Sequence, residues 1–281
     1  MPPRPNPTAR QGRLGAELRK LRESAGVVSR DVAAWLGTNQ AQISNIEAGK
    51  HGISEERLRK LAEYYACDDT RLVESLVAMA NDRARGWWEE YRGVLPARAL
   101  DLPELEHHSA RIRTFQFAHI PGLLQTEDHI RAASLFVQPQ LPESDRADLT
   151  AFRLRRQQVL GTGRAYEAII HEAALRMRVG GPEVARAQLE RVLSESERES
   201  VTVKVIPFTA DGFAGAGQSV LYIAGPVPQL DTAQVDTGNG SLFVDASARL
   251  HRYRTRLERI DSAALAPGPS RDLIRSISQE L

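Results

Sequence analysis

The stretch from residue 26 to residue 52, GVVSRDVAAWLGTNQAQISNIEAGKHG, restricts the possible folds of this chain more than any other part. In its first half, the apolar residues Val32, Ala33 and Leu36 recur with the spacing of one helix face. Gly37 follows them directly, and glycine commonly interrupts a helix. The pattern predicts a short helix that ends in a tight turn.

A second short helix is predicted directly after this turn. Asn39 can cap it, because an Asn side-chain oxygen can accept from the N–H groups at a helix start. Ile43 and Ile46 are expected to face inward, and Gly49 suits the left-handed backbone that ends many helices. Two helices joined by a tight turn form the helix-turn-helix pattern, whose second helix enters the major groove of DNA. The residues expected to face outward are Gln40, Gln42, Ser44 and Asn45. In the major groove, the amides of Gln and Asn can match the hydrogen-bond donor and acceptor of adenine.

Three further helices are predicted around this pair, over residues 14–21, after Ser54 and over residues 72–79. Together they indicate an all-α, five-helix DNA-binding domain over residues 10–82. The preceding nine residues, MPPRPNPTA, read as a disordered arm.

The letters AAWLGTNQAQISNIEAGK at residues 33–50 resemble the XRE, or phage-repressor-like, family of helix-turn-helix regulators. The resemblance implies that Gln40 and Ala41 take the first two positions of the recognition helix and that Asn45 contacts a base one turn later. Ala41 would then contact a thymine methyl group or nothing.

The same resemblance implies roles for residues outside the recognition helix. Arg22 and Glu47 are expected to form a structural ion pair that supports the domain. Three residues fall where family members touch phosphates, and they are Ser29, Arg30 and Lys50.

The distribution of charge agrees with a DNA-binding N-terminal part. Residues 1–66 hold 11 Lys and Arg against 7 Asp and Glu, and residues 67–281 hold 26 against 29. The positive excess therefore lies on the predicted DNA-binding domain, and it is small enough that a dimer is expected to be needed for tight binding.

Cys67 is the single cysteine, which excludes an internal disulfide and fits a reducing cytosol. No apolar run is long enough to cross a bilayer, so the expected location is cytoplasmic, at the nucleoid when the protein is bound to DNA.

Residues 83–281 predict a second, α/β domain, so that the whole chain is an α+β multidomain protein. Strands interspersed with helices indicate a mixed sheet. Strands are predicted at 111–117, 165–171, 201–208, 218–224, about 230–236 and 241–244, and helices at 83–94, 143–160, from 182 onward and twice at the end of the chain.

This second region resembles the C-terminal domain of unknown function of WhiJ-like actinobacterial regulators. The resemblance lies in WWEEY at 87–91, PGLLQTED at 121–128, GGPEV at 180–184 and the strand at 203–208. It implies a regulatory and dimerisation domain over residues 83–281. It also implies a small BldB-like partner protein, because such regulators are often encoded beside one, and some look like antitoxins.

Catalytic chemistry is not indicated by the sequence. The Gly-rich stretch 212–217 stands between two predicted strands, whereas a phosphate-binding loop opens a helix, so a hairpin or lid is expected. The histidines lack metal-ligand spacing. We therefore expect no metal, no cofactor and no enzymatic activity. A ligand or partner surface is hypothesised at Phe213, Tyr222 and Asp236.

The sequence therefore predicts a dimeric, sequence-specific transcriptional regulator, a repressor, that is gated by a partner or ligand at its C-terminal domain. An antitoxin-like protein that neutralises a small partner and autoregulates its operon, or a small-molecule sensor, are the alternatives. The apolar spacing over residues 250–264 fits either packing on the domain's own sheet or a dimer seam.

Overall fold

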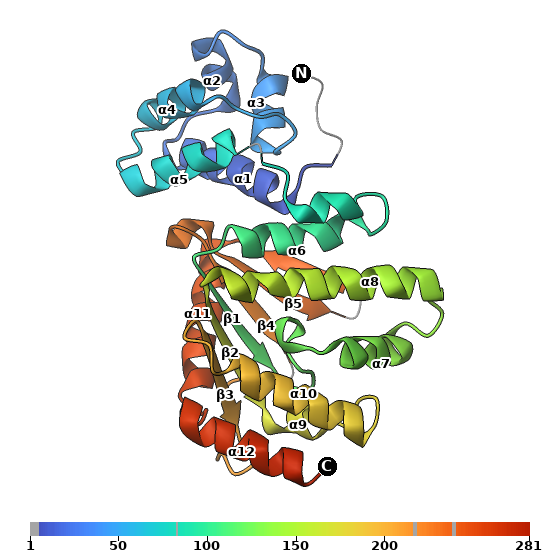
Figure 1. Cartoon of the computed structure of the whole chain (residues 1–281). Coiled ribbons are helices and arrows are strands. Elements are labelled where there is room, and N and C mark those ends of the chain that lie inside the picture. Colours follow the sequence, from blue (N-terminus) through green and yellow to red (C-terminus); the bar gives the residue numbers. More distant parts are fainter. Residues whose placement is uncertain (1–5, 83, 216–217, 238–239) are drawn as a thin grey trace. The chain divides into compact units, whose positions relative to one another are not determined.

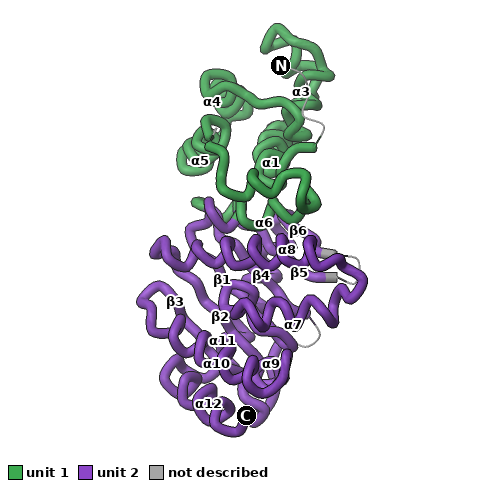
Figure 2. The backbone as a smooth tube through the Cα atoms, turned by 45° about the vertical axis from the view of Figure 1, so that its right-hand side comes forward, with its two compact units in different colours: residues 1–105, 226–230 green, residues 106–225, 231–281 purple. Residues whose placement is uncertain are grey.

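The computed structural model describes residues 6–82, 84–215, 218–237 and 240–281. The chain forms two compact units, shown in Figure 2: the first comprises residues 1–105 and 226–230, and the second residues 106–225 and 231–281. The predicted domain boundary after residue 82 therefore differs from the observed division. One reason lies in the start of the first helix, where the backbone N–H of Ala9 donates to Asp101 Oδ1 at 2.8 Å and so ties residues beyond 82 to the first unit.

The first unit contains the predicted helix-turn-helix bundle (Figure 1). Asn39 caps α3 as predicted, and Ser54 likewise accepts from a backbone N–H in the first turn of the helix after it. Asp69 caps a further helix in the same way, although this cap was not predicted from the sequence. Leu18, Leu58 and other apolar side chains from these helices share one buried cluster. The helices are α1 (Ala9–Ser24), α2 (Ser29–Trp35), α3 (Gln40–Glu47), α4 (Glu55–Tyr64) and α5 (Thr70–Asn81).

Two segments at the ends of this bundle differ from the predictions. Residues 1–5 of the predicted arm lie outside the described residues, whereas Thr8 caps α1 by accepting from the N–H of Gln11 at 3.2 Å. The helix predicted over 83–94 is a shorter 3-10 helix, Trp87–Tyr91. Pro96 disfavours helical backbone at Leu95, the residue before it, so the predicted helix cannot run on into the next one. Helix α6 (Ala97–His107) begins just after this proline.

The second unit is built on the predicted mixed sheet. Among the described residues, six strands form one sheet in the order β3-β2-β1-β4-β5-β6. β1, β2 and β3 are mutually parallel, and β4, β5 and β6 each pair antiparallel with the strand before them in this order. The strands are β1 (Arg111–Gln116), β2 (Ala165–His171), β3 (Val201–Ile206), β4 (Val220–Ala224), β5 (Thr232–Thr237) and β6 (Gly240–Val244).

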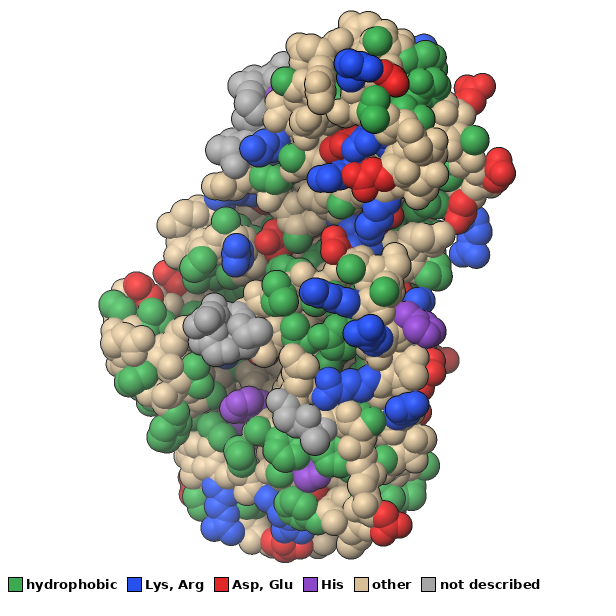
Figure 3. All heavy atoms as spheres, turned by 180° about the vertical axis from the view of Figure 1, so that it is seen from behind, with side chains coloured by type: hydrophobic (Ala, Val, Ile, Leu, Met, Phe, Trp, Pro, Cys, Tyr) green, Lys and Arg blue, Asp and Glu red, His purple; other side chains and the backbone are tan. Residues whose placement is uncertain are grey.

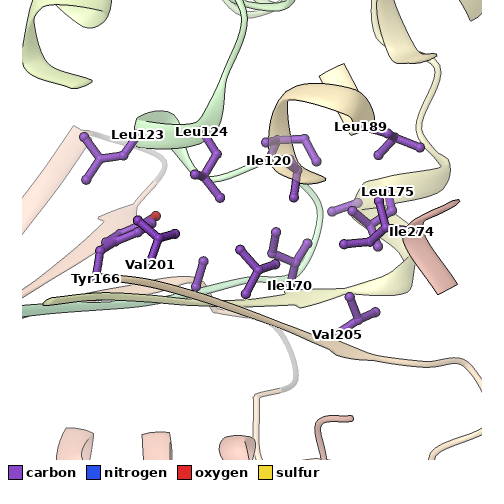
Figure 4. Close-up of a cluster of buried hydrophobic side chains, with 14 of the residues drawn as sticks. Ile120, Leu123, Leu124, Tyr166, Ile170, Leu175, Leu189, Val201, Val205 and Ile274 are labelled. Carbon is purple, nitrogen blue, oxygen red and sulfur yellow. The ribbon is translucent and has the colours of Figure 1, made fainter. Parts of the chain in front are cut away.

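Each face of the sheet has its own core. Ile170 of β2 points into one buried cluster, together with Leu189 and Ile274 (Figure 4). Ala168 of the same strand belongs to this cluster. Ile169, between Ala168 and Ile170 in sequence, belongs to the other cluster, because successive side chains of a strand point to opposite faces. The helices of this unit are α7 (Glu127–Val137), α8 (Glu143–Arg156), α9 (Glu172–Arg176), α10 (Pro182–Glu195), α11 (Ser247–Asp261) and α12 (Pro267–Gln279).

Helix α11 distinguishes between the two interpretations of residues 250–264. Leu250, Leu257 and Ile260 are each at most 1% exposed and lie in the same buried cluster as Ile169, on one face of the sheet. The apolar spacing therefore serves packing on the domain's own sheet. None of the described helices is long and apolar enough to span a membrane.

Candidate nucleic-acid interface

The α2–turn–α3 pair has the geometry that the sequence predicts. Helix α2 ends at Trp35 and α3 begins at Gln40. Asn39 Oδ1 accepts from the backbone N–H of Gln42 at 2.9 Å, which satisfies one of the N–H groups left open at a helix start. The cap therefore fixes the first turn of α3, where the predicted base-reading residues begin.

Helix α3 has a buried side and an open side. Ile43 and Ile46 are 2% and 6% exposed and anchor the helix in the core of the first unit. The open side, here called the reading face, carries the five residues predicted to read bases: Gln40, Ala41 and Ser44 are exposed, and Gln42 and Asn45 are half-buried. Amide and hydroxyl groups thus lie together on the accessible side of one short helix.

The two glutamines of the reading face are held by neighbouring hydroxyl groups. Gln40 Nε2 donates to Ser29 Oγ at 3.1 Å, which joins the start of α3 to the start of α2. The Thr38 hydroxyl donates to Gln42 Oε1. These bonds restrict the side-chain rotamers, so less conformational entropy is lost when a duplex is bound.

Close contact with α1 fixes the position of α3. A Cβ atom at Gly15 would lie 2.5 Å from the carbonyl oxygen of Glu47, at the end of α3. Just beyond that end, Gly49 has a φ of +72°, and a Cβ there would lie 2.7 Å from the carbonyl oxygen of Gln11. Both distances are too short for any residue other than glycine. The two glycines therefore allow α3 to pack directly on the α1 backbone.

The ion pair implied for Arg22 and Glu47 is present at this contact. Arg22 Nε and Nη2 donate to the two carboxylate oxygens of Glu47 at 2.6 and 3.0 Å, and Nη1 donates to the carbonyl oxygen of Val27 at 2.9 Å. The hydrogen bond to Glu47 raises the pKa of Arg22 above its usual value. The pair ties the C-terminal turn of α1 to the end of α3 and does not belong to the reading face.

The residues implied for phosphate contact flank the reading face in the chain. Ser29 and Arg30 form the first turn of α2, and Lys50 follows α3. The Arg30 side chain is 82% exposed and lies 3.5 Å from Asp31 Oδ1, and Lys50 is exposed. Exposed cations at the start of α2 and just beyond the end of α3 can contact a phosphate backbone.

The three residues hypothesised as a ligand or partner surface do not form one exposed surface in the structure. Tyr222 is 4% exposed and its hydroxyl donates to Asp231 Oδ2 at 2.5 Å, so it is a core residue and not a surface one. Asp236 accepts from the Ser241 hydroxyl at 2.8 Å across the β5–β6 pair. Phe213 packs against Phe115 at a ring-centroid distance of 5.8 Å, beside the same buried cluster that contains Tyr222.

Phe213 is instead part of a ring cluster at the carboxyl ends of the parallel strands. The cluster consists of Phe117, His171, Phe208 and Phe213, and the three phenyl rings lie 4.8, 5.4 and 5.0 Å from the imidazole ring, in that order. Phe117 and Phe208 are 37% and 58% exposed. Histidine and hydrophobic side chains gather on one face of the second unit in Figure 3.

The ring cluster was missed by reasoning from the sequence, although a signal exists. His171 ends β2, and Phe117 and Phe208 follow the ends of β1 and β3 by one and two residues. In open α/β sheets, ligands bind at the carboxyl ends of the strands, near the point where the strand order reverses.

The Nδ1 atom of His171 accepts from the N–H of Ala173 at 3.2 Å, and burial lowers the pKa of His171, so its neutral form is favoured.

The described residues contain no group of three or more His, Cys, Asp or Glu side chains that could hold a metal ion. Residues 216–217 of the Gly-rich stretch lie outside the described residues. The described part of that stretch joins β3 to β4 and so does not open a helix.

Comparison with known families gave two matching domain models. A model described as a helix-turn-helix domain matches residues 13–75, and such a domain indicates a DNA-binding regulator. A model described as a domain of unknown function (DUF5753) matches residues 99–276, more than half of the chain. Searches of curated proteins and of solved structures gave no match. The chain therefore belongs to the family defined by this domain of unknown function, with a helix-turn-helix domain preceding it.

Proposed function

We propose that this protein is a sequence-specific transcriptional regulator that binds double-stranded DNA as a homodimer and acts as a repressor. The observation that carries the proposal is the reading face of α3. Its polar side chains are accessible, while Ile43 and Ile46 on the opposite side and the Gly15 contact fix the helix to a rigid core. A preorganised helix of this kind can enter a major groove without rearrangement.

Base recognition is assigned to the amides. Gln40 and Asn45 each offer a donor and an acceptor, the pattern that matches N6 and N7 of adenine, and the methyl group of Ala41 suits a thymine methyl. Each well-formed contact of this kind discriminates against the wrong base by about 1 to 3 kcal/mol. Ser29, Arg30 and Lys50 contact phosphates, which set the register of the helix on the duplex without reading sequence.

A dimer is part of the proposal because one recognition helix reads few base pairs. Two helices related by a twofold axis read half-sites separated by about one helical turn, roughly 34 Å. The small positive excess of residues 1–66, 11 basic against 7 acidic side chains, also favours two binding units over one. A dimer bound over a promoter blocks it sterically, and this mode of action is the reason for proposing a repressor.

The second unit is proposed to receive the input that gates binding. The ring cluster supports a small-molecule input, because partly exposed rings lie at the strand ends where α/β sheets bind ligands. An input by a small BldB-like partner protein is supported by Leu135, Phe136 and Val137 at the end of α7, which are 55%, 78% and 68% exposed. Consecutive exposed apolar side chains of this kind are typical of protein contact surfaces.

The apolar end of α7 also supports a second candidate function. In an antitoxin-like protein the second unit would bind and neutralise a small partner, and DNA binding would autoregulate the operon. Co-purification separates the two functions: a toxic partner whose activity falls on binding supports the antitoxin, and a partner that only changes operator affinity supports the gated regulator.

The central test is selection of bound duplexes from a random pool by the purified full-length protein. We expect enrichment of an inverted repeat with half-site centres about one helical turn apart. Substitution of Gln40 by Ala should change the enriched bases at one half-site position, and Arg19→Ala, on the exposed side of α1, should not. Failure to enrich any sequence at low ionic strength contradicts the proposal.

A further inference from the structure

Residues 226–230, here called the β4–β5 segment, connect two strands of the second unit but belong to the first unit. Val227 and Leu230 are 4% and 7% exposed, and they lie in the same buried cluster as the apolar side chains of the helix-turn-helix bundle. The hydrophobic core of the first unit therefore includes two residues that are separated from α5 by more than half of the length of the chain.

The middle of the segment bonds to two helices of the first unit. The carbonyl oxygen of Gln229 accepts from Arg13 Nη2 on α1, and Gln229 Nε2 donates to Asp69 Oδ2 at 2.8 Å. The other oxygen of Asp69 accepts from the N–H of Leu72 at 3.0 Å and so caps α5. Gln229 thus links the buried arginine of α1 to the capping residue of α5.

The ends of the segment are held by a residue of the second unit. Asp231 is 5% exposed, and its carboxylate accepts from the Tyr222 hydroxyl at 2.5 Å and from the N–H of Gly225 at 2.9 Å. Arg254 Nη1 lies 3.7 Å from the same carboxylate. These three partners all belong to the second unit, so a single carboxylate fixes where the segment leaves β4 and enters β5.

We propose that the β4–β5 segment couples the state of the second unit to the order of the DNA-binding unit. A rearrangement of the β4–β5 hairpin that displaces Asp231 withdraws Val227 and Leu230 from the helical core and loosens α1 and α5. Because α3 packs on α1 at Gly15, the reading face then loses part of its support. The effect on DNA binding rests on the proposed function, whereas the loosening of α1 and α5 does not.

The first test measures amide hydrogen exchange in the full-length protein without DNA. Val227→Ala removes two methyl groups from the buried core of the first unit, and exchange in α1 and α5 should become roughly tenfold faster. Val203→Ala is the matched control, because Val203 is 1% exposed in β3 within a different cluster. It should accelerate exchange near β3 and leave α1 and α5 unchanged. Unchanged exchange of α1 and α5 in V227A overturns the inference.

The second test alters the second unit alone. Asp231→Ala removes the carboxylate that fixes the segment, and Tyr222→Phe removes one of its donors while keeping the ring, which provides a milder variant. Both should accelerate exchange in α1 and α5, although neither residue belongs to the first unit. Faster exchange in β4 with unchanged exchange in α1 and α5 overturns the coupling. If exchange in α1 and α5 is faster in both variants while the wild-type protein itself binds no duplex, the coupling is supported and the proposed function is contradicted.

Discussion

Removal of Arg22 offers a direct test of what holds the recognition helix in place. Arg22 and Glu47 form a bidentate pair at 2.6 and 3.0 Å, and their side chains are 11% and 9% exposed. Arg22→Ala leaves the Glu47 carboxylate in a mostly buried site without its main donor. Breaking a fully buried pair costs about 3 to 5 kcal/mol. Because some solvent reaches both side chains, we expect a smaller loss of about 2 to 3 kcal/mol in the unfolding free energy of the first unit.

Differential scanning calorimetry of the full-length protein measures this loss. For a unit of this size, about 2 to 3 kcal/mol corresponds to a fall of roughly 10 to 20 °C in the melting temperature of its transition. Arg19→Ala is the matched control, because Arg19 lies on the same helix and pairs with Glu23 at 2.7 Å, but these side chains are 62% and 50% exposed. Exposed pairs contribute little, so this variant should melt close to the wild type. Equal melting temperatures for R22A and R19A would refute the reasoning.

Four further predictions follow from the interface and its surroundings. Gln40→Ala should weaken binding to the selected operator by about 1 to 3 kcal/mol in a titration and leave random-duplex binding unchanged; equal losses on both would show that Gln40 does not read sequence. Arg30→Ala should weaken binding to every duplex and lower the slope of log K against log salt by about 1, and an unchanged slope would remove Arg30 from the phosphate contacts. Gly15→Ala should destabilise the first unit by roughly 1 to 3 kcal/mol in urea titrations, whereas Gly12→Ala, whose Cβ would meet nothing within 4 Å, should not. Burial raises the pKa of Glu104 from 4.5 to about 7. Protonated Glu104 therefore contributes fully to the unfolding free energy of the first unit below about pH 4.5, and this contribution, up to about 3 kcal/mol, is lost as pH rises through about 7. Glu104→Gln should flatten this pH dependence, and an identical pH dependence in both proteins would contradict the assignment.

The helix-turn-helix could be predicted closely because its signals are local. The cap at Asn39, the apolar spacing of Ile43 and Ile46 and the breaks at the two flanking glycines all act within a few residues. The same locality explains the strands of the second unit, which lie within a few residues of their predicted positions. Errors are concentrated at ends: the strand predicted to reach Phe208 stops at Ile206, because Pro207 cannot continue the ladder.

The surface hypothesised at Phe213, Tyr222 and Asp236 shows where such reasoning stops. Tyr222 stands on a strand, and which face of a strand is buried depends on the register with its neighbours. In the structure, pairing with β1 and β5 places Tyr222 toward α11 and Asp231. Phe213 meets His171 because three parallel strands end at one edge of the sheet, and no local pattern specifies that edge.

The sequence by itself therefore determined the secondary structure of the DNA-binding bundle, its outward amides and its positive charge, because periodicity, caps and composition are properties of short stretches. The tertiary structure alone decided that residues 226–230 complete the core of that bundle, that Gln229 links α1 to the cap of α5, and that the ring cluster forms around His171. These features join residues far apart in the chain. Their contacts follow from strand order and packing, which no short window of residues contains.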